Sequence, residues 1–188
     1  EKNILGYVAP YPIPEVIRNM NAFTLGARYM NPDVEVHMVW INTWFDPVKE
    51  REAAKALLDL GADVIARESD SIEPDKLAQE EGVYVVGYNS YVPDAAPDAL
   101  LTAPVWHWGL FYKRVVEAVK NGTWTNTPFW GSMADGIIYL APYGKMVPDD
   151  VIEKVEDMRL KIITGEFDVF EGPIYDQDGN LKVPEGVT

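Results

Sequence analysis

Hydrophobic residues switch between strand-like and helix-like spacing along the first half of the chain. Short apolar runs predict four strands, and apolar residues spaced three or four apart between them predict three helices. The strands fall near residues 4–9, 34–40, 63–66 and 83–88, and the helices open near Pro14, at Asp46-Pro47 and at Glu73-Pro74. Strands that alternate with helices predict an α/β fold with a parallel sheet and right-handed crossovers.

The run at residues 34–40 differs from the other three because Glu35 and His37 alternate with its apolar residues. A strand with one polar face is typical of a sheet edge. A flavodoxin-like strand order, 2-1-3-4, puts the second strand at the edge, and we expect this order here. The loops after the first and third strands then flank the crevice in which ligands bind.

The second half of the chain is richer in loops. Its pattern predicts a helix over 105–121, short extended pieces at 129–132 and 136–140, a last helix that opens at Pro148 and ends at Gly165, and a hairpin at Asp178-Gly179. We divide the chain at this change of character. Residues 1–101 form an α/β lobe, and residues 102–188 supply connecting segments, the last helix and the hairpin.

Composition narrows the classes of function. The chain has 188 residues, no cysteine and a formal net charge of -14. This charge argues against nucleic-acid binding, which needs Lys and Arg to meet phosphates. Without cysteine, neither a disulfide, nor thiolate catalysis, nor a cysteine-bound metal is available. His37 and His107 have no metal-ligand spacing around them.

Residues suited to touch a small molecule follow each predicted strand of the first half. They are Tyr11 after the first, Asn42, Thr43 and Trp44 after the second, Ser69, Asp70 and Ser71 after the third, and Asn89 and Ser90 after the fourth. Aromatic faces with a few oriented polar groups suit a flat heterocycle. Turns and helix caps also use such residues, and N-capping alone explains Asp46. For Asp70 both interpretations stay open.

The six tryptophans and the catalytic motifs carry less information. The segments Trp106-His107-Trp108-Gly109 and Phe129-Trp130-Gly131 are denser in aromatic surface than a core requires, which favours half-wet clefts or interfaces. Packing against a partner surface explains any one of them equally well. The sequence contains no Gly-x-Ser-x-Gly elbow, Walker loop or dinucleotide fingerprint, so catalysis has little support.

Several segments resemble the basic membrane protein family, the PnrA-like substrate-binding proteins of ABC transporters. They are 7–18, 61–65, Val39-Trp40-Ile41-Asn42-Thr43-Trp44-Phe45-Asp46-Pro47, Trp106-His107-Trp108-Gly109, Asp135-Gly136 and Leu140-Ala141-Pro142-Tyr143. The Trp-Phe-Asp-Pro segment is specific to one branch of this family. The resemblance runs over nearly the whole chain.

The resemblance implies a type I periplasmic-binding-protein fold, in which two α/β lobes joined by crossover segments close on a purine nucleobase or nucleoside. Family positions that face the ligand correspond to Trp44, Asp70, Asn89, Trp106 and Asp135, and we add Tyr11 and Trp130 as aromatic candidates. No cofactor, metal ligand or catalytic residue is implied. A complete member has a further lobe before the equivalent of Ile4, so we expect this chain to form the second lobe with its crossovers.

The implied partners are a purine, the permease of an importer, and the first lobe or a second copy of this chain. The implied location is periplasmic or extracellular, with a membrane anchor on the full-length protein. Two other interpretations stay open. A sensory or regulatory module can use the same fold, and a nucleoside-acting enzyme could use Asp70 or Asp135 as its acid or base.

Overall fold

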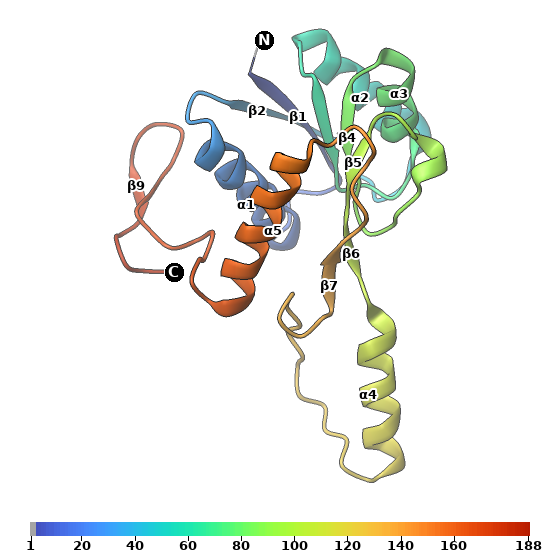
Figure 1. Cartoon of the computed structure of the whole chain (residues 1–188), viewed down its shortest axis with the longest axis vertical. Helices are drawn as coiled ribbons and strands as arrows, with labels where there is room; N and C mark the ends of the chain where they lie inside the picture. Colours follow the sequence, from blue (N-terminus) through green and yellow to red (C-terminus); the bar gives the residue numbers. More distant parts are fainter. Residues whose placement is uncertain (1–2) are drawn as a thin grey trace.

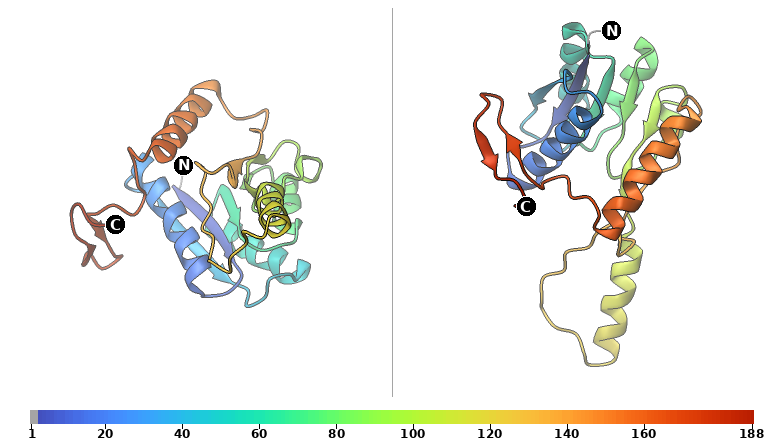
Figure 2. Two further views of the ribbon diagram at one scale, coloured as in Figure 1. Left: turned by 90° about the horizontal axis from the view of Figure 1, so that it is seen from below. Right: turned by 60° about the vertical axis from the view of Figure 1, so that its left-hand side comes forward.

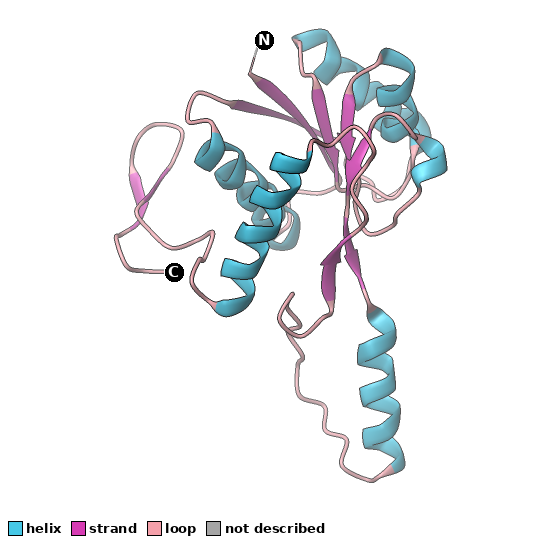
Figure 3. Cartoon of the chain, in the orientation of Figure 1, coloured by secondary structure: helices cyan, strands magenta, loops and turns pink. Residues whose placement is uncertain are grey.

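The computed structural model describes residues 3–188 and is organised around a parallel five-stranded sheet (Figures 1 and 3). The strands are β1 (Ile4–Ala9), β2 (Glu35–Trp40), β3 (Val64–Arg67), β4 (Tyr84–Val86) and β5 (Leu100–Thr102). They lie in the order β2-β1-β3-β4-β5, and every neighbouring pair is parallel. The predicted order 2-1-3-4 is confirmed, with β2 at one edge and a short fifth strand added at the other.

Helices cover both faces of this sheet. On one face, α2 (Pro47–Leu60) and α3 (Glu73–Glu81) pack Leu57 and Leu77 against buried strand residues such as Ile65. On the other face, α1 (Pro14–Met30) packs Val16 and Met20 near Tyr7 and Ala66. The alternation of inward and outward residues along β1 and β3 therefore divides the core into two layers.

Close packing of α2 on β1 explains a glycine in the strand. A Cβ atom at Gly6 would lie 2.7 Å from the Ile65 Cδ1 atom and 2.9 Å from the Leu57 Cβ atom. Both neighbours are wholly buried, so neither has space to move away. The absent side chain lets the helix approach the sheet closely.

The start of α2 follows the sequence prediction. The Asp46 carboxylate accepts hydrogen bonds from the backbone N–H groups of Val48 (3.2 Å) and Lys49 (3.1 Å), which fits its N-cap position before Pro47. Gly61 ends the helix with a φ of 106°, a left-handed value that glycine adopts without a steric penalty. The cap fixes where the loop carrying Trp44 meets the helix.

In the structure we define the lobe as residues 3–103, which include all of β5, and the extension as residues 104–140. The chain leaves the lobe through this extension. A 3-10 helix, η1 (Pro93–Ala95), precedes β5. Strand β6 (Pro104–Trp106) leads outward to α4 (Trp108–Lys120), and a long loop returns to β7 (Ile138–Leu140), which pairs antiparallel with β6. Figure 1 shows α4 pointing away from the sheet, and the right-hand view of Figure 2 shows the same after a turn about the vertical axis. No residue of α4 is buried.

One prediction for this extension is wrong. The helix predicted over 105–121 begins at Trp108, because Val105 instead pairs with Tyr139 and is buried beside Ala103 and Ala141. Of the two short extended pieces predicted, the one over 136–140 contains β7, and residues 129–132 lie without strand pairing in the loop that returns from α4. The start of this helix is set by the pairing of Val105 with the distant Tyr139. The spacing of hydrophobic residues within the helix does not reveal this pairing.

The last segments lie beside α1. Helix α5 (Asp149–Thr164) ends at Gly165, and Phe167 then meets Tyr29 of α1 with ring centroids 5.6 Å apart. The predicted hairpin is present as β8 (Ile174–Tyr175) and β9 (Leu181–Val183). Across residues 3–188, we find no helix with the length and apolar character needed to cross a bilayer.

Candidate functional site

The candidate site lies at the edge of the sheet where the parallel strands end. Because β1, β2, β3 and β4 run in the same direction, the loops that follow them emerge together on this edge. Four predicted residues follow these strands in turn, namely Tyr11, Trp44, Asp70 and Asn89. The topology therefore brings four of the seven predicted residues to the edge at which open α/β sheets bind ligands.

Three of these residues are directly connected. The rings of Tyr11 and Trp44 pack edge to face, with centroids 5.5 Å apart and planes at 61°. The backbone N–H of Asp70 donates to the carbonyl oxygen of Trp44 at 2.9 Å. Trp44 is 40% exposed and Asp70 is exposed, so both remain open to a ligand. An aromatic pair beside a carboxylate offers both stacking and a strong hydrogen-bond acceptor.

The carboxyl group of Asp70 is electrostatically distinct from an ordinary surface aspartate. Partial burial by the surrounding loops raises its pKa, the negative charge of Glu50 raises it further, and Arg67 opposes both effects. The residue as a whole is exposed, so we attribute the shift to limited access of water to the carboxyl group rather than to full burial. A ligand that donates a hydrogen bond there would replace this partial hydration.

Asn89 and Trp106 form a second group at the same edge, where the lobe joins the extension. Asn89 has a φ of 62°, a left-handed conformation that asparagine tolerates better than most residues, and its N–H donates to the carbonyl of Pro104 at 2.9 Å. Trp106 packs edge to face on Tyr88, the neighbour of Asn89, at 4.9 Å between centroids. The loop after β4 is thus fastened to the first strand of the extension.

Trp130 comes from the extension and contacts Arg18 of the lobe. The Arg18 guanidinium of α1 lies 4.7 Å from the centroid of a Trp130 ring, within range of a cation–π interaction. Trp130 is nevertheless 76% exposed. It therefore presents a large aromatic surface near the N-terminal turns of α1.

Asp135 is engaged in its own turn. Its carboxylate accepts hydrogen bonds from the Ser132 N–H (2.9 Å) and the Ser132 hydroxyl (2.7 Å), and these bonds lower its pKa. Among the hydrogen bonds found in residues 3–188, those of the Asp135 carboxylate are with Ser132. The structure does not bring this residue into the group formed by Tyr11, Trp44 and Asp70.

A buried carboxylate beneath this edge was not predicted as a site residue. Glu68, the first residue after β3, is wholly buried and accepts hydrogen bonds from the Tyr7 hydroxyl (2.8 Å) and the Asn19 side-chain amide (2.6 Å). Burial raises its pKa to about 7, although both hydrogen bonds lower it. The signal in the sequence was its register, because Glu68 shares a strand face with the buried Ala66.

A buried ion pair lies on the opposite face of the same strand end. Arg67 of β3 and Asp75 of α3 are 3% and 1% exposed, and the Arg67 Nε donates to the Asp75 carboxylate. Burial raises the pKa of Asp75, and the charge of Arg67 opposes that shift. The Arg67 Nη2 atom and the Ser69 hydroxyl find no hydrogen-bond partner within the described part of the chain.

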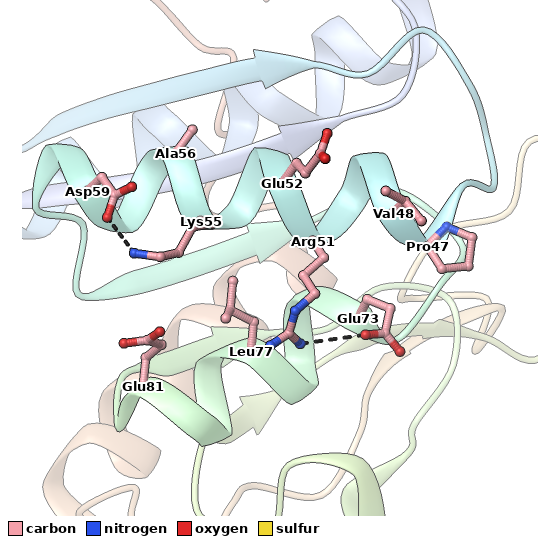
Figure 4. A pocket seen from close by; sticks show the side chains of 10 residues that line it. All are labelled: Pro47, Val48, Arg51, Glu52, Lys55, Ala56, Asp59, Glu73, Leu77 and Glu81. Carbon is pink, nitrogen blue, oxygen red and sulfur yellow. Dashed lines mark hydrogen bonds and ion pairs between the residues drawn. The ribbon is translucent and has the colours of Figure 1, made fainter.

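Two hollows of the surface bear on the candidate site. One, of about 670 Å³, is an outer groove between α2 and α3 in which several charged residues pair with each other, including Arg51 with Glu73 at 3.6 Å and Lys55 with Asp59 at 2.5 Å (Figure 4). A hollow of about 240 Å³ lies beside the candidate edge, between Asn19, Phe23, Tyr88 and Trp106. It is smaller than typical ligand pockets, so the residues around it do not enclose a ligand-sized cavity by themselves.

Residues able to hold a metal ion do not gather anywhere in residues 3–188. No group of three or more His, Asp or Glu side chains is arranged to do so.

Comparison with known proteins identifies the family. The Bmp family, described as "ABC transporter substrate-binding protein PnrA-like", matches residues 1–171. This chain belongs to the Bmp family. The match includes the whole lobe, the extension and α5, and so contains all seven predicted site residues.

Two curated relatives and one solved structure extend this comparison. A purine-binding protein of Brucella abortus is 42% identical over 99% of this chain, and a protein of Haloferax volcanii named as an ABC transporter glucose-binding protein is 39% identical over 96%. The matches span 53% and 46% of those relatives, so the chain covers about half their length. The crystal structure of a transcriptional activator of the comK gene from Bacillus halodurans shares the fold, with a TM-score of 0.79, 24% identity, and coverage of 89% of this chain and 58% of that one.

Proposed function

We propose that this chain forms the ligand-binding lobe, with its crossover segments, of a substrate-binding protein that delivers a purine nucleobase or nucleoside to an ABC importer. The observation that carries the proposal is the connected group of Tyr11, Trp44 and Asp70 at the carboxyl edge of the sheet. The purine-binding relative, 42% identical over nearly the whole chain, supports this ligand class.

The proposed contacts follow from the chemistry of each side chain. Trp44 and Tyr11 would pack on the purine ring, and Asp70 would accept a hydrogen bond from a ring N–H or from a ribose hydroxyl. Asn89 offers both a donor and an acceptor, which suits the mixed edge of a purine. Trp106 and Trp130 would cover the ring from the side of the extension, and Asp135 would fix the turn that carries this side.

A second lobe would close the site. The chain covers about half the length of its curated relatives, and its extension leaves and re-enters the lobe next to the candidate edge. We propose that the extension packs on a further α/β lobe and that ligand binding closes the two lobes like a hinge. The closed form would be the one that the permease recognises, at a periplasmic or extracellular site to which the full-length protein is anchored.

Glucose is a second candidate ligand because one relative of 39% identity is named for it. Aromatic rings beside a carboxylate also suit a sugar. The two ligands differ in what Trp44 would do, since only a purine offers a flat ring whose π-system can stack on the indole. Perturbation of the near-ultraviolet spectrum of tryptophan by a bound purine would favour the first candidate.

Native mass spectrometry of the purified chain, followed by release of small molecules, tests the proposal. Isothermal titration with adenine, hypoxanthine, adenosine, inosine and glucose then gives affinities for this chain and for the full-length protein that contains it. A purine that co-purifies, or a purine Kd far below that of glucose, supports the proposal. Binding of glucose alone, or no heat with any purine for the full-length protein, refutes it.

Substitution of Asp70 tests the assignment of the site. Loss of a charge-assisted hydrogen bond is expected to cost about 1.5–3 kcal/mol, so Asp70→Asn should weaken purine binding about tenfold to a hundredfold. Asp59→Asn on the outer surface of α2 is the matched control and should leave the affinity unchanged. Incubation with nucleosides should release no free base, since the proposed function is binding and not catalysis.

A further inference from the structure

The ligand-facing side chains lie on three separate loops that must be held at fixed positions relative to one another. These are the loop before α2 (residues 41–46), which carries Trp44, the loop before α3 (residues 68–72), which carries Asp70, and the loop after β4 (residues 87–92), which carries Asn89. Among the hydrogen bonds of residues 3–188, the one from the Asp70 N–H to the Trp44 carbonyl joins the first two loops directly. The remaining links between the loops come from beneath.

Glu50 links the first two loops. It lies in the first turn of α2 and is wholly buried. Its Oε1 atom accepts a hydrogen bond from the backbone N–H of Asp46 at 3.0 Å, and its Oε2 atom accepts one from the backbone N–H of Ser71 at 3.1 Å. The two oxygens of one carboxylate therefore hold two loops that precede different helices.

No cation accompanies Glu50 among the ion pairs of residues 3–188. Its charge is balanced by the two backbone N–H groups and by the N-terminal end of α2, where the helix dipole favours a negative charge. A buried carboxylate without a cationic partner is costly unless hydrogen bonds satisfy it, and an apolar residue here would leave the N–H groups of Asp46 and Ser71 without this acceptor. The charge fits a role in which two N–H groups must both be held in place.

Arg67 links the second and third loops by donating hydrogen bonds, whereas Glu50 links the first two by accepting them. Its Nη1 atom donates to the carbonyl oxygen of Ser69 at 2.9 Å and to that of Tyr88 at 3.3 Å. Asp75 orients the guanidinium from α3. Arg67 thus holds two carbonyl groups as Glu50 holds two N–H groups, and the loop before α3 is held by both.

We propose that Glu50 and Arg67 are positioning residues that hold the three ligand-facing loops in register and thereby set ligand affinity without touching the ligand. The inference rests on the proposed function, because it assumes that Trp44, Asp70 and Asn89 contact the ligand together. In geometric terms, a shift of one loop would separate the stacking ring from the carboxylate. Precise placement of such groups determines how much of their interaction energy a ligand receives.

The test compares Glu50→Gln with Glu52→Gln. A glutamine at position 50 keeps the size of the side chain but replaces one acceptor oxygen with an N–H₂ group, so one of the two N–H groups loses its partner. Glu52 lies on the same helix and is exposed, so its substitution is the matched control. We expect adenine to bind Glu50→Gln at least tenfold more weakly than the wild type at pH 7, and to bind Glu52→Gln as the wild type does. The titrations extend down to about pH 3.5, because the pKa of Asp70 is raised from an ordinary value of 3.8.

The pH profile separates positioning from general destabilisation. The charges that act on the Asp70 carboxyl group are those of Glu50 and Arg67, and Asp70 in turn acts on the nearby Tyr88. Removal of the Glu50 charge in Glu50→Gln should lower the pKa of Asp70. The midpoint of the pH dependence of adenine binding should therefore lie at lower pH in Glu50→Gln than in the wild type. A purely structural loss would lower the melting temperature without moving this midpoint.

Amide hydrogen exchange provides a readout that needs no ligand. We expect the N–H groups of Asp46 and Ser71 to exchange at least tenfold faster in Glu50→Gln and to be unchanged in Glu52→Gln. If the wild type binds neither purine nor glucose, the proposed function fails, and the exchange rates still decide whether Glu50 holds the loops. Unchanged exchange, or adenine affinity within twofold of the wild type with the same pH profile, would overturn the inference. If Glu50→Gln does not fold, Glu50→Asp, which keeps the charge but reaches less far, should give an intermediate loss.

Discussion

The lobe and the extension place their apolar residues in opposite environments. In the lobe, Leu57, Ile65 and Val85 are wholly buried in a continuous core. In the extension, α4 carries Trp108, Tyr112 and Val116 on its surface and buries none of its residues. An apolar residue in the lobe stabilises this chain, whereas one in α4 is placed to contact something outside it.

The comparison predicts its largest effect for core truncations. Leu57→Ala should lower the free energy of unfolding by about 2–5 kcal/mol, because it removes buried methyl groups and leaves a cavity between α2 and β1. Val116→Ala on α4, where the side chain is 65% exposed, should change it by less than about 0.5 kcal/mol. Urea denaturation of both variants measures the difference. Equal effects would mean that α4 packs against the lobe in solution.

The pH dependence of stability should also come from the lobe. The pKa of Glu68 is raised from 4.5 to about 7, so between these values the folded chain keeps a proton that the unfolded chain releases. Its contribution is complete below pH 4.5 and is lost as the pH rises through 7. At about 1.4 kcal/mol per pKa unit, the loss is on the order of 3 kcal/mol at most.

One variant in each region tests whether this pH dependence comes from the lobe or from the extension. Glu68→Gln should flatten the decline in unfolding free energy between pH 5 and pH 7.5, measured by urea denaturation. Asp135→Asn in the extension should leave the decline intact, because the pKa of Asp135 is lowered and the group titrates below this range. The reverse pattern would show that the buried carboxylate is not the titrating group.

Removal of the whole extension should change the stability of the lobe much less than a core truncation does. Trp106 pairs with Ile138 across the β6–β7 ribbon, so an Asn-Gly turn can join them in place of residues 107–137. The lobe should still unfold cooperatively. Its free energy of unfolding should change by less than about 1 kcal/mol, which includes the loss of the Arg18–Trp130 contact. Circular dichroism and urea denaturation check this. A molten or aggregated product would show that the lobe depends on the extension.

Local signals in the sequence predicted most of the lobe. The spacing of hydrophobic residues predicted the strands, and Asp46 and Gly61 predicted the bounds of α2. The alternation of polar and apolar residues in β2 predicted its position at the sheet edge. The start of α4 could not be predicted in this way, because it depends on pairing of Val105 with Tyr139 far along the chain. The pairing overrides a helical pattern that is continuous in the sequence.

The same limit applies to the candidate site. The loops carrying Tyr11, Trp44, Asp70 and Asn89 could be placed at one edge, since parallel strands end together. The burial of Glu50 and Arg67 could not be predicted, because charged residues are usually solvated and only tertiary packing reveals it. For Glu68, the strand face that it shares with Ala66 was a signal in the sequence. The contact between Arg18 and Trp130 likewise joins segments that no local pattern relates.

The paired strands of the extension have a mechanical consequence. The chain crosses from the lobe to α4 and back through β6 and β7, which are bonded to each other residue by residue. A two-stranded ribbon resists rotation about any single backbone bond and deforms by bending. Helix α4 is about 20 Å long, so a force on its tip would bend the ribbon where it joins the lobe, at the contact of Trp106 with Tyr88.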